Sequence, residues 1–201
     1  MRVLENNSLN HLVRLVNMNN MNIEVKLTNK DEAYVIKNMY PLYLHDLSGH
    51  YGLGGEHTPN EHGIFEPSPD YKTLQDQYDV QNIWWEKPEC LYPFLMIVDG
   101  IPAGFAFIAT PPYCSQGTNF FVHDFFLMQP FRGVGVAEHA ASTIFGMFIG
   151  NWELFTNPSE KNKIGQSFWR KTVNHYTKGN YREMYGQTFD GYKLIFQFSN
   201  I

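Results

Sequence analysis

The alternation of apolar and polar positions predicts that a folded domain begins close to residue 21. Residues 23–28 alternate between apolar and polar side chains, which is typical of a half-buried strand. Thr28 or Asn29 can then cap a helix whose apolar positions run from Ala33 to Leu42. A loop rich in Gly, Pro and His is expected over residues 49–70, and a second helix over residues 71–85, ended by Pro88.

The rest of the chain predicts further strands and two longer helices. Asp-Gly at 99–100 and again at 190–191, each between apolar runs, predicts two hairpins. The expected elements are strands at 94–98, 104–109 and 119–128, a helix at 134–148, a strand at 152–156, a helix at 162–176, and strands at 181–189 and 192–198. This order predicts an α+β domain over residues 21–201, with one mixed, mostly antiparallel twisted sheet of about seven strands flanked by about four helices.

The first 20 residues follow a different pattern. No aromatic residue occurs before Tyr34, and an Asn-rich stretch covers residues 17–22. Ser8 can cap a short helix with Leu9, Leu12 and Val16 on one face. We expect residues 1–20 to form an appendage, either helical or flexible.

Composition narrows the class of protein. The 201 residues are 16% aromatic and 17% charged, which excludes a disordered chain or a coiled coil. The net charge is −5 and no basic stripe is present, so we expect no nucleic-acid partner. The longest uncharged stretch, 100–122, contains three prolines, so no membrane partner is expected. Two distant cysteines and the lack of an apolar leader favour a cytoplasmic setting.

A strand-turn-helix segment at 120–141 carries the clearest chemical signal. The predicted strand leads into Arg132-Gly133-Val134-Gly135-Val136-Ala137, where a helix begins. Glycines allow close approach to a phosphate, and free amides and the dipole at a helix N-terminus attract an anion. The segment lacks the Gly-Lys-Ser/Thr of a P-loop, and the dinucleotide fingerprint stops after two glycines.

These residues resemble the GNAT superfamily of acyl-CoA-dependent N-acetyltransferases. Arg132, Gly135 and Ala137 match the family's Q/R-x-x-G-x-G/A signature, and the element order fits over residues 23–198. Residues 157–169 also resemble the family's N-x-x-A-x-x-F-Y stretch. Gly165 replaces the usual alanine there, and Trp169 stands where a tyrosine commonly protonates the departing thiolate. An indole N–H cannot serve as that acid.

The resemblance implies acetyl-CoA as co-substrate. The pyrophosphate would lie on the amides around residues 134–137, and the pantetheine arm would pair with the end of the preceding strand, where one amide faces the thioester oxygen. Asn162 would contact the cofactor arm, with Phe168 beside it. The implied cofactor-binding residues are Phe126, Leu127, Met128, Arg132, Gly133, Val134, Gly135, Val136, Ala137, Asn162 and Phe168.

Direct transfer to an amine needs a base for the ammonium and an acid for the thiolate. Strand periodicity places Asp124 on the face of Val122 and Phe126, and Asp124 is the favoured base. His123 would point the other way and is the base if the two faces are reversed. Tyr176 is a candidate acid, with solvent or the substrate as alternatives.

The acceptor side is predicted to be acidic. No Lys or Arg occurs between Lys37 and Lys72, and the same interval contains Asp46, Glu56, Glu61, Glu66 and Asp70. In the resembled fold this region borders the acceptor pocket, so Tyr43 and Asp46 are expected to bind a small-molecule amine, favoured when cationic. Polyamines, aminoglycoside-like sugars and amino-terminal or lysyl amines are candidates.

Two other functions stay open at this stage. Trp169 in the acid position is compatible with a catalytically silent acyl-CoA-binding or interaction module. Four histidines between residues 45 and 62 would suit a metal-dependent enzyme, but their five-residue spacings do not align two ligands on one helical face, so no metal is expected. A monomer and a homodimer are both compatible with the sequence.

Overall fold

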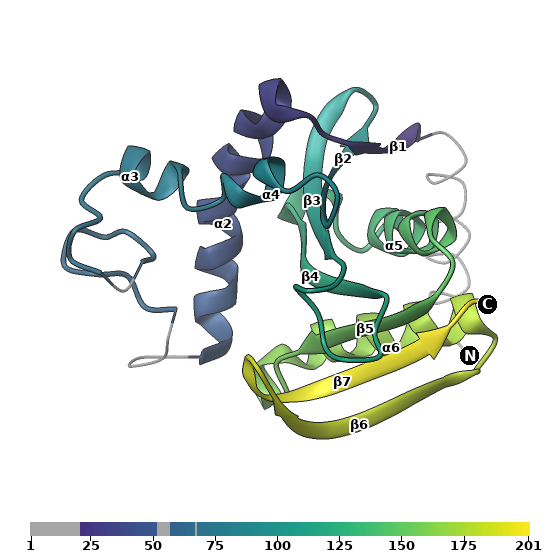
Figure 1. The fold of residues 1–201 in the computed structure, drawn as a ribbon. Coiled ribbons are helices and arrows are strands. Elements are labelled where there is room, and N and C mark those ends of the chain that lie inside the picture. Colours follow the sequence, from purple (N-terminus) through teal and green to yellow (C-terminus); the bar gives the residue numbers. More distant parts are fainter. Residues whose placement is uncertain (1–20, 52–56, 67) are drawn as a thin grey trace, which may run out of the picture.

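The computed structural model describes residues 21–51, 57–66 and 68–201; the predicted appendage at 1–20 and Glu56 lie outside them. Within these residues one seven-stranded sheet has the order β1-β2-β3-β4-β5-β7-β6 (Figure 1). All neighbouring strands are antiparallel except β4 and β5, which are parallel. The strands are β1 (Ile23–Leu27), β2 (Leu91–Val98), β3 (Ile101–Ala109), β4 (Phe120–Leu127), β5 (Asn151–Thr156), β6 (Tyr181–Thr188) and β7 (Gly191–Ser199).

Helices cover both faces of the sheet and create two hydrophobic cores. The helices are α2 (Ala33–Tyr51), α3 (Leu74–Tyr78), α4 (Ile83–Glu86), α5 (Val136–Met147) and α6 (Lys163–Thr177), with short 3₁₀ turns at Lys30–Glu32, Gln129–Phe131 and Glu160–Asn162. On one face α5 and α6 bury a core that includes Ala140, Phe145 and Val173. On the other face α2 and α4 bury a second core that includes Ile36 and Trp84. The predicted α+β architecture is confirmed.

Two helices differ from the prediction. Helix α2 continues through Pro41 to Tyr51, into the segment expected to be a loop. The helix expected over residues 71–85 is instead divided into α3 and α4 by a turn. The turn directs the side chain of Asn82 to the ammonium group of Lys37, which lies within 3.9 Å of Asp79. A buried lysine needs such partners, and this long-range contact outweighs local helical periodicity.

None of the described helices is both long and apolar enough to cross a membrane.

Candidate active site

The parallel strands β4 and β5 separate along their length. Their pairing runs only from Phe120 opposite Trp152 to Val122 opposite Leu154. Beyond Val122, β4 stays paired with β3 while β5 continues with β7. Figure 1 shows β5, β7 and β6 turned away from β2–β4. The β4 edge that faces β5 after Val122 therefore has no strand partner among the described residues.

Two residues of β4 direct their backbone groups to this open edge. The amide of Met128 donates to Ala103 O of β3 at 2.8 Å. Because successive residues of a strand direct their N–H and C=O groups to opposite edges, Phe125 and Leu127 face the open edge. Met128 was expected to be part of the strand end that pairs with the cofactor arm, but its amide is used within the sheet. Phe126, which also faces β3, contributes only its buried side chain.

A β-bulge at His123 changes which side chains share a face. Phe107 of β3 is opposite Asp124, whereas the next residue, Ile108, is opposite Val122, so His123 is an extra residue in β4. A bulge interrupts the alternation of side chains. Val122 therefore lies in the core under α5 and α6, while Asp124 lies on the α2 face. The predictions that Asp124 shares a face with Val122 and that His123 points the opposite way are both wrong.

Asp124 connects α2 to the bulge. The Tyr43 hydroxyl donates to Asp124 Oδ1 at 2.8 Å, and His123 Nδ1 lies 3.3 Å from Asp124 Oδ2. The Asp124 side chain is only 8% exposed, whereas the His123 side chain is 44% exposed. Tyr43 holds the carboxylate in place, and its expected contact with the acceptor stays a prediction.

The surroundings shift the proton affinity of two of these groups. Burial, reinforced by the charge of Asp124, raises the pKa of Tyr43 well above its usual value of 10.0, so its hydroxyl stays a donor at neutral pH. Burial alone would lower the pKa of His123, but the charge and hydrogen bond of Asp124 and the charge of Asp190 raise it above the usual 6.5.

The loop after β4 forms a concave group of backbone amides. Gly133 and Gly135 have φ values of +75° and +90°, which favour glycine, and Gly135 caps α5. Among the described residues, no carbonyl or side chain accepts a hydrogen bond from the amides of residues 133–138. Successive free amides at a helix N-terminus form an anion-binding concavity. The binding of a pyrophosphate by Gly133, Val134, Gly135, Val136 and Ala137 stays a prediction.

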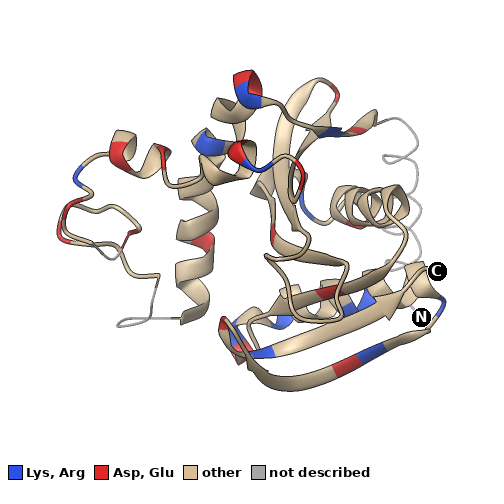
Figure 2. Ribbon diagram, in the orientation of Figure 1, with Lys and Arg blue, Asp and Glu red and all other residues tan. Residues whose placement is uncertain are grey.

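Arg132 is engaged within the protein. Its Nη2 forms an ion pair with Asp46 of α2, its Nε donates to Leu127 O, and its guanidinium lies 5.6 Å from the Phe126 ring. The residue therefore fixes the glycine loop between α2 and the end of β4. Asp46 was expected to attract the acceptor amine, but its charge is neutralised by Arg132. Figure 2 shows no Lys or Arg colouring on the lower half of α2, as expected from the lack of Lys and Arg between Lys37 and Lys72.

Asn162 is turned into the protein, which differs from the expected cofactor contact. The side chain is 5% exposed, and its Nδ2 donates to Thr156 Oγ1 and Asn157 O, both at 2.8 Å. Its Oδ1 lies only 2.3 Å from the position that a Cβ atom on Gly165 would occupy. Glycine at 165 therefore makes room for the Asn162 carboxamide, which explains the departure from the family's alanine.

The aromatic pair Phe168 and Trp169, near the middle of α6, borders the open edge of β4. The Phe168 ring stacks on Phe125 at a centroid distance of 5.7 Å, and the Trp169 ring meets Phe125 edge-on at 5.1 Å. Trp169 is buried in the core below α5 and α6, and Phe168 is half-buried beside it. Phe168 therefore lies where a group bound along β4 would pass.

Tyr176 does not belong to this site. Its ring packs against Phe145 and Phe198, and its hydroxyl accepts a hydrogen bond from Asn200 Nδ2 at 3.1 Å. These residues lie in the core on the α5 and α6 face, whereas Asp124 and His123 lie on the α2 face. The prediction of Tyr176 as general acid is wrong.

The β6–β7 hairpin closes the site from the other side, which the sequence reasoning missed. Lys193 Nζ donates to the Tyr51 hydroxyl at 2.9 Å and lies 3.0 Å from Asp190. Burial lowers the pKa of Lys193, but the bonds to Tyr51 and Asp190 outweigh it and raise the pKa above 10.5. Lys193 alternates with the core residues Leu194 and Phe196, so strand periodicity alone places it on the opposite face and gives no sequence signal for its buried partners.

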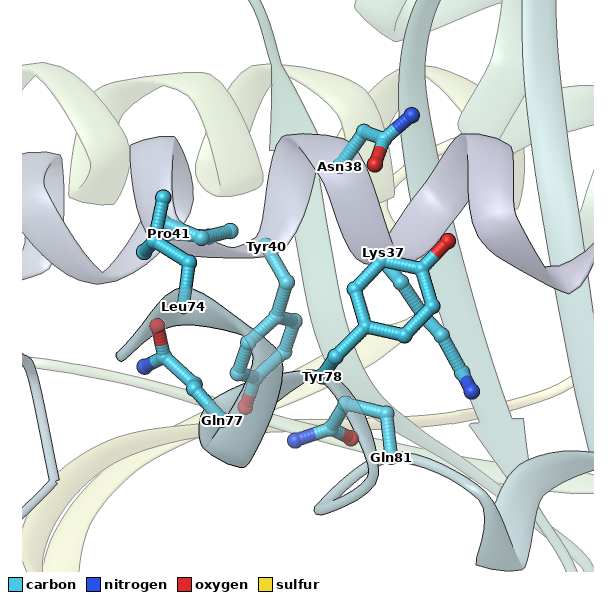
Figure 3. Close-up of a pocket in the computed structure, with 8 residues that line it drawn as sticks. All are labelled: Lys37, Asn38, Tyr40, Pro41, Leu74, Gln77, Tyr78 and Gln81. Atoms are coloured by element: carbon cyan, nitrogen blue, oxygen red, sulfur yellow. The ribbon is translucent and has the colours of Figure 1, made fainter. Parts of the chain in front are cut away.

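A pocket of about 100 Å³ lies between α2 and the segment that carries α3 (Figure 3). Lys37 and Tyr40 of α2 face Gln77, Tyr78 and Gln81 across it. The Tyr40 ring packs edge-on against Tyr43 at 5.6 Å and so lies between this pocket and Asp124. The pocket is therefore separate from the His123–Asp124 pair.

The histidines of the 45–62 segment do not form a metal centre in the described part of the chain, where no three His, Cys, Asp or Glu side chains are grouped to hold an ion.

No protein-family model and no curated protein sequence matches the chain. Solved structures, in contrast, do match the chain. An acetyltransferase from Thermus thermophilus superposes with a TM-score of 0.56 at 13% identity, over 88% of this chain and 96% of its own. AAC(6')-Ib in complex with ribostamycin and coenzyme A gives 0.56 at 14% identity, over 89% and 93%. A protein from Desulfovibrio desulfuricans assigned to the GNAT family of acetyltransferases gives 0.53 at 10% identity, over 89% and 98%.

These similarities establish the fold. The superpositions cover 88–89% of this chain and 93–98% of the three neighbours. The chain has the fold of the GNAT acetyltransferases, as its sequence motifs predicted.

Proposed function

We propose that the protein is an acetyl-CoA-dependent N-acetyltransferase that acts on the primary amine of a small acceptor. The observation that carries this proposal is the free amide concavity at residues 133–138, placed directly after a strand whose edge is unpaired. An anion on the concavity and an extended chain along the edge are the two parts of an acyl-CoA molecule that such a surface would recognise.

The cofactor would follow β4 from its C-terminal end toward the bulge. The pyrophosphate would accept hydrogen bonds from the amides between Gly133 and Ala137. The pantetheine amides would pair with Phe125 and with the N–H of Leu127, whose carbonyl already accepts from Arg132 Nε. From Leu127 to His123 the strand covers about 13 Å at roughly 3.3 Å per residue. The thioester would then lie where β4 and β5 part, beside His123 and Asp124.

At that point the protein can support direct attack by an amine. A backbone amide on the open edge is available to stabilise the oxyanion that forms on the thioester oxygen. The Asp124–His123 pair is available to take the proton from the ammonium. The acceptor would occupy the space bounded by α2 and the β6–β7 hairpin, where the Asp124 carboxylate favours a cationic group.

The structural neighbour AAC(6')-Ib has been captured with the amine sugars ribostamycin and kanamycin, which supports testing aminoglycosides here. The test is a two-part measurement. Calorimetric titration with CoA should show binding, and CoA release from acetyl-CoA should increase with at least one member of a panel of kanamycin, spermidine and a lysyl peptide. Failure to bind CoA would refute the proposal.

A second function keeps specific support. Trp169 is buried in the core and Tyr176 is remote, so neither residue can protonate a thiolate at the β4 edge. A catalytically silent acyl-CoA-binding module would bind CoA in the calorimeter. It would release no CoA from acetyl-CoA with any acceptor of the panel.

A further inference from the structure

We propose that His123 is the catalytic base and that Asp124 and Tyr43 are positioning residues which orient its imidazole, an arrangement created by the bulge in β4. This proposal rests on the proposed acetyl transfer. It assigns the roles within a pair of neighbouring residues that strand periodicity would have placed on opposite faces.

The bulge makes the arrangement sterically accessible. Neighbouring residues in a regular strand point to opposite faces and cannot form a side-chain pair. Here the extra residue at 123 lets His123 contact the rings of Trp84 and Phe121 on the α2 face, at centroid distances of 5.2 and 6.0 Å. Asp124 lies on that same face, with His123 Nδ1 3.3 Å from its Oδ2.

The two carboxylate oxygens of Asp124 differ in their hydrogen bonds. Oδ1 accepts from Tyr43, while Oδ2 is buried and accepts no conventional hydrogen bond from a described residue. The polar atom that faces Oδ2 is His123 Nδ1. A buried carboxylate oxygen needs a donor, and we assign this role to a proton on Nδ1, 3.3 Å away. That tautomer leaves the lone pair of His123 on Nε2.

Exposure separates the two candidate bases. Asp124 is 8% exposed and is covered by Tyr43 and His123, so an acceptor amine cannot reach its oxygens without displacing one of them. His123 is 44% exposed, and its Nε2 has no hydrogen-bond partner among the residues described. The imidazole also lies at the first β4 position after pairing with β5 ends, where the thioester is expected.

The rings of Trp84 and Phe121 pack against the His123 imidazole and add to its contact with Asp124. The Trp84 ring meets the imidazole at an interplanar angle of 74° and is itself stacked on Phe107 at 4.2 Å. A base held by packing and a hydrogen bond is preorganised for its proton.

The charges that face His123 come from two elements. Asp124 belongs to β4 and is bonded to Tyr43 of α2, while Asp190 belongs to the β6–β7 hairpin and is paired with Lys193. Together the carboxylates outweigh the effect of burial on the imidazole, so the pKa of His123 is raised above 6.5. A base whose pKa is close to the working pH is effective in both accepting and releasing a proton.

The proton balance of the step is complete. His123 Nε2 accepts one proton from the acceptor ammonium, and the neutral amine nitrogen forms a bond to the thioester carbon. The resulting intermediate expels the thiolate as the C–S bond breaks. The remaining extra proton passes from nitrogen to sulfur, directly or through solvent, and His123 returns its own proton to solvent.

Four variants test the assignment: His123→Gln, Asp124→Asn, Tyr43→Phe and, as a matched control, Tyr40→Phe. Tyr40 lies one turn from Tyr43 in the same aromatic cluster, but its hydroxyl faces Gln81 and not Asp124. Each variant is first checked for an unchanged circular dichroism spectrum. The kcat, KM and pH profile are then measured with acetyl-CoA and whichever of kanamycin, spermidine or lysyl peptide is acetylated.

We expect His123→Gln to lower kcat about 100-fold, the usual contribution of a general base, with the KM for acetyl-CoA unchanged. Asp124→Asn should lower kcat less and move the acidic limb of the pH profile to lower pH, because the imidazole loses its neighbouring anion. Tyr43→Phe should lower kcat roughly tenfold, and Tyr40→Phe should leave it close to the wild-type value. A larger loss in Asp124→Asn, with the acidic limb unchanged in His123→Gln, would overturn the assignment.

An NMR titration of the imidazole nitrogens separates this proposal from acetyl transfer itself. The His123 signals, identified by their loss in His123→Gln, should show a proton on Nδ1 and a pKa that falls in Asp124→Asn. An unchanged pKa in that variant would overturn the pairing even in an active enzyme. A coupled pair in a protein without any acetyl transfer would refute the proposed function, and with it the catalytic role of His123.

Discussion

The contact between Asn162 and Gly165 predicts that Gly165→Ala lowers the free energy of unfolding of the wild-type protein. The same substitution is expected to raise it once the Asn162 side chain is removed. Replacing Gly165 by alanine places a methyl group 2.3 Å from the present position of Asn162 Oδ1. The carboxamide must then move, and its Nδ2 loses the bonds to Thr156 Oγ1 and Asn157 O.

The expected size follows from these two bonds and from helix propensity. Two hydrogen bonds at about 1 kcal/mol each give a loss of about 2 kcal/mol. Alanine in place of glycine within α6 returns up to about 1 kcal/mol. The net loss of about 1 kcal/mol should lower the melting temperature of a chain of this length by about 2–4 °C.

The sign should reverse when Asn162 is removed first. In an Asn162→Ala background the methyl group at 165 has space, so Gly165→Ala should raise the free energy of unfolding by up to about 1 kcal/mol. Asn157 O keeps a donor in that background, Gln166 Nε2 at 3.2 Å, so the comparison is not complicated by a newly orphaned carbonyl. Urea denaturation of the four proteins would give a coupling energy of about 2 kcal/mol.

Additive effects in this cycle would refute the reasoning, because they would mean that the Asn162 carboxamide is not fixed above Gly165. The variant Asn162→Ala also tests the role implied by family resemblance. Because Asn162 is bonded inward, the substitution should reduce stability and leave CoA affinity largely intact; the opposite result would show that Asn162 turns outward to the cofactor.

Three further predictions concern the site. Gly135→Glu should weaken CoA binding at least tenfold in calorimetry, because a carboxylate would repel the pyrophosphate and a side chain is strained at φ +90°. The control Ile149→Glu, at a 75% exposed position beyond the other end of α5, should leave CoA binding unchanged. Tyr176→Phe should leave turnover unchanged, since it removes only a bond to Asn200; a loss of turnover would return Tyr176 to the mechanism. Lys193→Met should lower the melting temperature at pH 8. The difference from wild type should shrink as the pH rises above 10.5, because a lysine whose pKa is raised in the folded state stabilises the fold below that pH and no longer does so once it is deprotonated. A constant difference up to about pH 11.5 would contradict the ion-pair assignment.

Much of the fold was readable because it depends on local signals. Asp-Gly turns and alternating strands located the hairpins, and the glycines after β4 located the amide concavity. The break between α3 and α4 had a local signal too, since Thr73 and Asp76 form a capping box that starts a helix inside the segment expected to be continuous.

The contacts that shape the site depend on residues far apart in the chain. Tyr43 meets Asp124 across 81 positions, and Arg132 meets Asp46 across 86. Periodicity identifies the face on which a residue lies, but not which charged group of another element will neutralise it. For this reason the sequence predicted that Asp46 attracts the acceptor amine, whereas the folded chain pairs Asp46 with Arg132.

The bulge at His123 was hidden for a related reason. Strand β4 is covered by a core on both faces, so apolar residues occur at consecutive positions, as in Phe121-Val122 and Phe125-Phe126. A strand with one exposed face would reveal an inserted residue as a break in its alternation, but a doubly buried strand has no alternation to break. The same double burial removes Asp124 from water and leaves His123 as the exposed member of the pair. The feature that conceals the site from pattern analysis is therefore the one that decides which of the two residues can reach a substrate.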